Sequence, residues 1–133
     1  GVYSLEMARL YNYLLQNTTS EYTIVHSLDG YDEISLTGNY KMVSRDKEQI
    51  IEPEIKFEQK DLFGGKSIEE SAKIFQDVLN GEGTKAQNEV VIANAAMAIN
   101  CVKKNTLTES TAEARESLES KKALNVFNKL IRS

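Results

Sequence analysis

Two adjacent carboxylates, Asp32 and Glu33, are the residues of this sequence best suited to chemistry. They close the acidic segment 29–33, Asp-Gly-Tyr-Asp-Glu, which follows a short β-rich run over 22–26. Carboxylate oxygens are hard ligands, and Mg²⁺ held by them usually keeps several waters while it bridges substrate phosphates. Such a pair could hold Mg²⁺. The alternative, which the chemistry alone favours because acidic pairs are common, is a solvated acidic turn, or the first turn of a helix, where the helix dipole favours acidic side chains.

Other residues could also take part in chemistry, and each has a structural alternative. His26, at the end of the β-rich run, is either a substrate hydrogen-bond donor or general acid–base, or a buried histidine satisfied by backbone. The glycines at 64–65 precede a predicted helix, where a phosphate can bind, but they lack the spacing of known phosphate loops, which favours a tight loop. We expect Cys101 to be an inert core thiol, and Asn94 and Asn100 to pair with backbone groups.

The first half of the chain combines one helix with short strands. Ser4 is a suitable N-cap for a helix over 4–16, and apolar residues recur there at helical spacing. The run 22–26 is expected to be a strand that feeds the acidic loop, as at the carboxyl edge of an α/β sheet. A short segment over 34–39 turns at its end, and strands follow at 41–44 and 49–57. Pro53 restricts the last of these to a sheet edge or a bulge.

The second half has the periodicity of helices. Ser67 and Glu70 predict a capping box for a helix that ends at Gly81. Asn88 is expected to cap a second helix that runs to about Lys103 and is apolar nearly all round, hence buried on several sides. Two more helices are predicted, one from Thr108 and one over 123–131. This order predicts the α/β class, close to α+β if the chain is an isolated piece.

Composition excludes several classes of function. The chain has 133 residues, enough for one domain, and 16 basic against 20 acidic residues give a net charge of −4. Without a cationic excess, neither nucleic acid nor an anionic membrane is expected as a partner. One cysteine and one histidine exclude a disulfide framework and a four-ligand zinc site, and they favour the reducing cytoplasm. The start at Gly1, without an initiator Met, predicts a truncated or processed piece.

Several motifs occur in a recognisable order. The chain opens with Gly-Val-Tyr-Ser at 1–4, continues with a helix, and carries Asp-Gly-Tyr-Asp-Glu-Ile-Ser-Leu-Thr-Gly at 29–38. Further along stand the glycines at 64–65, followed by Glu70, Ala72 and Ile74, and then Asn-Ala-Ala at 94–96. In this order they resemble the second half of an anthranilate phosphoribosyltransferase, over essentially all 133 residues, with 29–38 as the specific part. The chain departs from the family pattern at Ser27, Tyr31, Ser71 and the segment 120–122.

The resemblance carries expectations for fold and activity. It implies that residues 1–133 form a single domain, the C-terminal part of the large α/β domain of a nucleoside phosphorylase/phosphoribosyltransferase-like fold. That fold has short central strands, a small β-hairpin and several C-terminal helices. Enzymes of the family transfer the phosphoribosyl group of PRPP to anthranilate in tryptophan biosynthesis and release pyrophosphate. The family's Asp-Glu pair binds Mg²⁺, which makes Asp32 and Glu33 the metal ligands and assigns no catalytic side chain to this chain.

The resemblance also implies that parts of the enzyme lie elsewhere. The family's PRPP loop and its N-terminal helical domain are upstream and absent from these residues, so the fragment alone is expected to be inactive. Apolar surface that upstream strands would cover is expected to drive self-association, as a homodimer or otherwise. Two alternatives stay open. One is a non-catalytic helical interaction module with a solvated acidic loop, and the other is a related pyrimidine nucleoside phosphorylase, although those enzymes generally lack the Asp-Glu pair.

Overall fold

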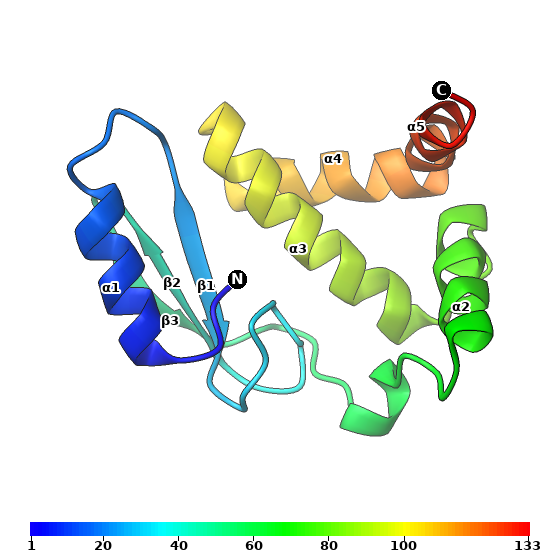
Figure 1. Ribbon diagram of the computed structural model, residues 1–133, viewed down its shortest axis with the longest axis horizontal. Coiled ribbons are helices and arrows are strands. Elements are labelled where there is room, and N and C mark those ends of the chain that lie inside the picture. Colours follow the sequence, from blue (N-terminus) through cyan, green and yellow to red (C-terminus); the bar gives the residue numbers. More distant parts are fainter.

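A small antiparallel sheet and five helices make up the structure, a computed structural model of residues 1–133 (Figure 1). The elements, in chain order, are α1 (Leu5–Leu15), β1 (Thr23–Ser27), β2 (Tyr40–Ser44), β3 (Glu48–Ile51), the 3₁₀ helix η1 (Gln59–Leu62), α2 (Ile68–Asn80), α3 (Lys85–Lys103), α4 (Leu107–Glu119) and α5 (Lys122–Leu130). The predicted mixed α/β class is confirmed. No helix has the length and apolar content that crossing a membrane requires.

The sheet lies between two helical layers. Its strands run antiparallel in the order β1-β2-β3, with Ile24 opposite Val43 in the first pair. Successive side chains of a strand point to opposite faces. Ile24 and Val43 therefore pack with Ala8 of α1 on one face, whereas Met42 packs with Met97 of α3 on the other. Figure 1 shows α3 crossing the middle of the molecule, with the sheet and α1 on one side of it.

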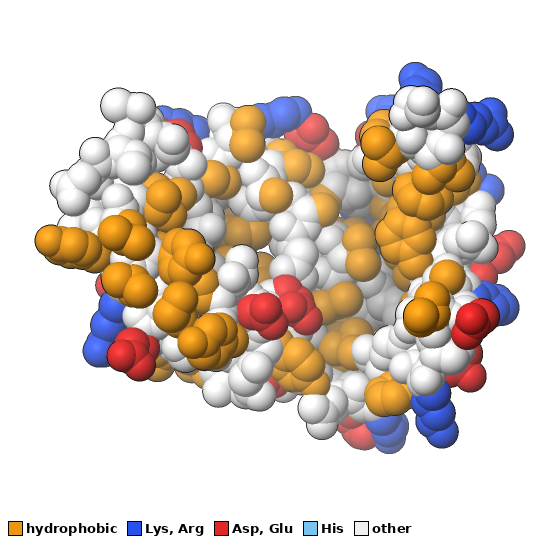
Figure 2. All heavy atoms as spheres, viewed as in Figure 1, with side chains coloured by type: hydrophobic (Ala, Val, Ile, Leu, Met, Phe, Trp, Pro, Cys, Tyr) orange, Lys and Arg blue, Asp and Glu red, His pale blue; other side chains and the backbone are white.

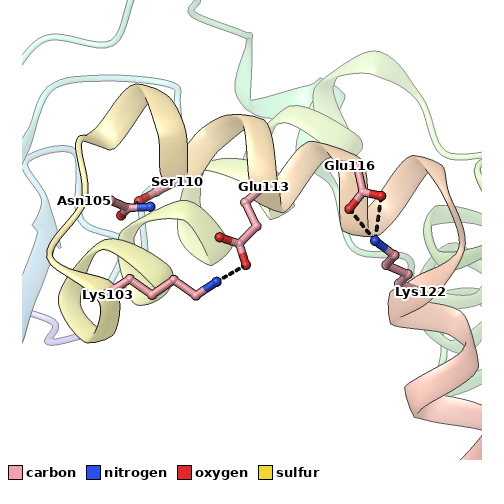
Figure 3. A network of polar contacts seen from close by, with 6 residues as sticks. All are labelled: Lys103, Asn105, Ser110, Glu113, Glu116 and Lys122. Atoms are coloured by element: carbon pink, nitrogen blue, oxygen red, sulfur yellow. Dashed lines mark hydrogen bonds and ion pairs between the residues drawn. The ribbon is translucent and has the colours of Figure 1, made fainter.

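The other side of α3 packs on α2 and α4. Ile92 and Ala96 of α3 form an apolar cluster with Val78 of α2 and with Ala114 and Leu118 of α4. The expectation that this helix is buried on more than one side is confirmed. Two ion pairs also link α4 to its neighbours (Figure 3). Lys103 at the end of α3 pairs with Glu113 of α4, and Glu116 of α4 pairs with Lys122 of α5. These pairs are exposed, so the apolar cluster supplies most of the cohesion.

Several element boundaries differ from the sequence-based expectation, in each case because a nearby group makes the better cap or stop. α3 begins at Lys85 because Thr84 and Gln87 form a capping box, so Asn88 lies inside the helix rather than capping it. Ser67 does cap α2, but the Glu70 carboxylate accepts from the backbone amide of Lys66, so the expected reciprocal box is incomplete. The predicted strand 49–57 ends at Ile51, before Pro53, and the 3₁₀ helix η1 follows at Gln59–Leu62.

Large apolar side chains remain on the surface of two helical regions. On α1, Leu10, Tyr13 and Leu14 are 48%, 66% and 56% exposed, and on α5 Val126 and Leu130 are 67% and 70% exposed. Figure 2 shows apolar atoms over α1 on one side of a face, and over α2 and α5 on the other, with a hollow between them. Such patches commonly mark surfaces that bind a partner. Self-association through them stays a prediction.

One partly buried ion pair gives the fold an acid-sensitive contact. Glu89 of α3 accepts a hydrogen bond from Arg115 of α4 at 2.8 Å, and this bond holds the pKa of Glu89 below its ordinary value. Because the folded pKa lies below the unfolded one, the pair contributes fully above the ordinary glutamate pKa and is lost as pH falls through the folded pKa. Glu89→Gln is expected to lower the free energy of unfolding by about 1 kcal/mol at pH 7 and by much less at pH 3, measured by urea titration.

Glu119 provides the matched control for that prediction. It approaches the other guanidinium nitrogen of Arg115 at 3.8 Å, and its side chain is 67% exposed. Glu119→Gln is therefore expected to leave the free energy of unfolding nearly unchanged at both pH values. A cost for Glu89→Gln that is the same at pH 7 and pH 3 would contradict the assignment.

Candidate functional site

The acidic pair lies on the long loop between β1 and β2. Asp32 and Glu33 are both exposed, and neither belongs to any of the ion pairs of the protein. Figure 2 shows acidic side chains over this loop in the middle of the displayed face. The next residue, Ile34, is only 1% exposed. The chain therefore presents two free carboxylates to solvent from a loop that is anchored directly behind them.

Asp29, the first acid of the segment, has a different role from the pair. Its carboxylate accepts hydrogen bonds from the hydroxyls of Ser35, at 3.3 Å, and Thr37. Gly38 allows this approach, because a Cβ at that position would lie 3.1 Å from the Asp29 carboxylate oxygen. The three acids of segment 29–33 thus divide into one that organises the loop and two that remain free. The sequence pattern did not separate them.

Side chains, rather than a strand ladder, fix the backbone that follows the pair. The Ser27 hydroxyl, fully buried at the end of β1, donates to the Glu33 carbonyl at 2.6 Å and accepts from the Ser35 amide at 3.1 Å. The Asn94 carboxamide on α3 accepts from the Ile34 amide at 3.0 Å and donates to the Ile34 carbonyl at 2.8 Å. Side chains of β1 and α3 therefore hold backbone groups of the three consecutive residues 33–35.

The loop continues in an uncommon backbone conformation. Leu36 has a φ of 57°, in the left-handed region that branched side chains rarely adopt, and its side chain is buried. The Leu36 carbonyl accepts a hydrogen bond from the Phe57 amide at 2.9 Å, which fixes this part of the loop to the segment after β3. A conformation of this cost persists only where its surroundings enforce it, and such positions cluster near functional sites.

The exposed pair fits a divalent cation that takes its other ligands from elsewhere. No cluster of three or more histidine, cysteine or acidic side chains is present that could enclose a metal ion. A cavity of about 640 Å³ lies between the segment after β3 and helices α3 and α4, and neither Asp32 nor Glu33 lines it. Mg²⁺ is commonly bound by one or two carboxylates together with waters and substrate phosphates. Two open carboxylates match that donor set.

His26 and the glycines at 64–65 make contacts that stabilise the fold. The His26 ring is buried, and its Nδ1 lies 2.8 Å from the Val2 carbonyl, which favours the structural interpretation of this residue. Because a carbonyl can only accept, Nδ1 carries the proton. The Gly64 carbonyl accepts from the Ser71 hydroxyl at 2.6 Å, and Gly65 has a φ of 93°, as expected for a tight turn before α2.

The polar residues of α3 agree with the sequence in part. Both asparagines pair with backbone, as predicted: Asn94 with residue 34, and Asn100 through its Nδ2 with the Asn105 carbonyl at 2.5 Å. Cys101 was expected in the core, but it is partly exposed and belongs to none of the three apolar clusters. The physical reason is that α3 meets the sheet and α4 on only part of its surface, as the 79% exposure of Val102 shows.

A match to a known family gives the class of this protein. The sequence pattern of the glycosyl transferase family, a/b domain, matches residues 1–124, and the chain belongs to this family. The residues matched include the whole sheet, the acidic loop and helices α1 to α4.

Individual relatives within this class carry one name. The chain is 52% identical, over 98% of its residues, to the anthranilate phosphoribosyltransferase of Christiangramia forsetii. Its fold is similar to that of the anthranilate phosphoribosyltransferase of Thermus thermophilus, with a TM-score of 0.85 at 26% identity over 97% of this chain and 40% of that one. It is also similar to the Saccharomyces cerevisiae enzyme in complex with PRPP and Mg, with a TM-score of 0.78 at 25% identity over 94% of this chain and 38% of that one. The resemblance inferred from the motifs is confirmed.

The chain matches only part of the length of each relative. The chain spans about 40% of the length of the curated relatives it matches. In those relatives, the region that matches the site described above is one part of a longer protein.

Proposed function

We propose that this chain is the C-terminal part of the catalytic domain of an anthranilate phosphoribosyltransferase, with residues 1–133 forming one domain. The remainder of the enzyme, including a helical domain and the PRPP loop, would supply the other parts of the site, and the chain alone would be inactive. Cytoplasmic location and self-association belong to the same proposal. It is supported by 52% identity to a relative of that name and by the exposed acidic pair on an anchored loop.

The reaction proposed for the intact enzyme exchanges one bond at the ribose for another. The bond from the anomeric carbon of PRPP to the pyrophosphate oxygen breaks, and the bond from the same carbon to the anthranilate nitrogen forms. That nitrogen loses a proton, and phosphoribosylanthranilate and pyrophosphate are the products. The amine of anthranilate is already nucleophilic, so no strong general base is needed from this chain. The anthranilate-contacting residues are not assigned among residues 1–133.

Asp32 and Glu33 are the observation that carries the proposal. Their carboxylates can only accept, and they lie free of ion pairs, so they can coordinate Mg²⁺ together with waters and the oxygens of pyrophosphate. Bound Mg²⁺ would supply positive charge where negative charge develops on the leaving group. The contribution of the chain is to hold two carboxylates at a fixed place, with the backbone behind them bonded to the buried Ser27 hydroxyl.

Removal of the metal tests the function directly. In the intact enzyme, meaning this chain together with the remainder of the protein, anthranilate is expected to be consumed only when PRPP and Mg²⁺ are both present. Excess EDTA is expected to reduce the rate to background, and added Mg²⁺ to restore it. Consumption that continues unchanged in EDTA would reject the metal role.

The two alternatives predict other results in the same assay. A pyrimidine nucleoside phosphorylase would release thymine from thymidine and phosphate, with no response to anthranilate. A non-catalytic interaction module would give no turnover with either pair of substrates. The free acidic pair and the names of the relatives favour the transferase.

A further inference from the structure

Asn94 makes a connection between distant parts of the chain that the proposed function does not use. Its carboxamide forms three hydrogen bonds: from the Ile34 amide at 3.0 Å, to the Ile34 carbonyl at 2.8 Å, and to the Val90 carbonyl of its own helix at 2.8 Å. Residues 34 and 94 are 60 positions apart, and the first two bonds join the acidic loop to α3. The side chain thus pairs with the backbone of Ile34 as a neighbouring strand would.

The need for this pairing follows from burial. Ile34 is 1% exposed, and its backbone groups have no partner in a strand ladder, because β1 ends at Ser27 and β2 begins at Tyr40. A buried amide or carbonyl without a partner is costly, so a side chain must supply both a donor and an acceptor. A carboxamide does this from one group, because it carries a donor and an acceptor side by side. An apolar residue of the same size would leave both backbone groups unsatisfied.

The position of the pairing connects it to the acidic pair. Ile34 directly follows Glu33, so the hydrogen bonds of Asn94 act one peptide away from the carboxylates. Ser27 fixes the flanking Glu33 carbonyl and Ser35 amide from the opposite side. If the contact from α3 is lost, each of the two peptide units that flank Ile34 keeps only its hydrogen bond to Ser27. The backbone that carries Glu33 is then less firmly fixed, and a change in its orientation alters the direction in which the carboxylates point.

We propose that Asn94 is a positioning residue, which holds the peptide after Glu33 so that Asp32 and Glu33 present their carboxylates together to a divalent cation. This inference rests on the proposed function. It assigns to α3 a part in metal binding, although both proposed ligands lie outside that helix. Outer-shell partners of metal ligands commonly change metal affinity by about 10- to 100-fold when they are removed.

The test measures metal dependence rather than activity alone. In the intact enzyme, Asn94→Leu is expected to raise the Mg²⁺ concentration for half-maximal activity by about 10-fold or more, while kcat at saturating Mg²⁺ falls much less. Binding of Mn²⁺ without substrates, followed by electron paramagnetic resonance, is expected to weaken by a similar factor. Asn94→Ala preserves helix propensity, and it decides the question if circular dichroism shows that Asn94→Leu does not fold.

Asn100 gives the matched control, because it lies on the same helix and also donates to a backbone carbonyl, but that carbonyl belongs to Asn105 and not to the acidic loop. Asn100→Leu is expected to leave the Mg²⁺ dependence unchanged. If the Asn94 variants shift the Mg²⁺ requirement no more than Asn100→Leu while Asp32→Asn shifts it strongly, the positioning role is wrong and the proposed function stands. If Asp32→Asn leaves the requirement unchanged, the proposed metal site fails, and the inference fails with it.

Discussion

Replacing both carboxylates of the acidic pair with amides, Asp32→Asn together with Glu33→Gln, is expected to lower kcat/KM for PRPP in the intact enzyme by about 100- to 1,000-fold. The substitutions keep the size of the side chains but remove two negative charges that would hold the metal beside the leaving pyrophosphate. Because both residues are exposed and unpaired, the free energy of unfolding is expected to change little. The measurement is steady-state kinetics at fixed Mg²⁺, with urea unfolding in parallel.

A control with the same change of charge separates a local effect from a general one. Asp46 and Glu54 are also exposed and belong to no ion pair, but they lie outside the acidic loop. Asp46→Asn with Glu54→Gln is expected to leave kcat/KM within a few-fold of the unmodified enzyme. If that double variant loses as much activity as the acidic-pair variant, long-range charge rather than metal coordination explains the effect. Normal activity in the acidic-pair variant would reject the proposed site.

The acidic pair could be singled out from sequence because Asp32 and Glu33 are neighbours that follow a recognisable strand. The pattern alone did not make them metal ligands, and that expectation depends on the family resemblance. The helices are predictable from local signals, since the caps at Ser4, Ser67 and Gly81 lie within a few residues of the elements they bound.

What the sequence could not provide is the way the loop is held. Nothing local indicates that Asn94 pairs with Ile34, because the two are 60 residues apart and an asparagine in an apolar helix has many possible backbone partners. The different roles of Asp29 and Asp32 also depend on tertiary contacts, namely the hydroxyls of Ser35 and Thr37 that fold back onto Asp29. An asparagine inside an otherwise apolar helix is the one signal that pointed to such a contact.

The surroundings of the loop also differ from the sequence-based picture. An acidic loop after a strand suggested the carboxyl edge of an α/β sheet, but β1 pairs antiparallel with β2 in a small sheet of three strands. The loop is therefore a connection between hairpin strands, with its ends brought together by Leu28 and Asn39, whose backbone groups bond at 2.8 Å. Ile34, the buried residue at the centre of this loop, packs in an apolar cluster and directly follows the acidic pair. It is therefore expected to affect both the stability of the fold and the site.

Truncation of Ile34 is expected to produce the largest loss of stability from a single side chain. Ile34 packs among Leu36, Tyr40, Met42 and Met97, with 1% of its surface exposed, so Ile34→Ala removes buried apolar atoms and leaves a cavity. The expected loss in free energy of unfolding is about 2–5 kcal/mol by urea titration. Ile50→Ala is the matched control, since Ile50 on β3 is 61% exposed and its truncation is expected to change stability by less than about 0.5 kcal/mol. Equal losses in the two variants would contradict the packing described for the loop, and weaker Mn²⁺ binding in Ile34→Ala alone would tie that packing to the acidic pair.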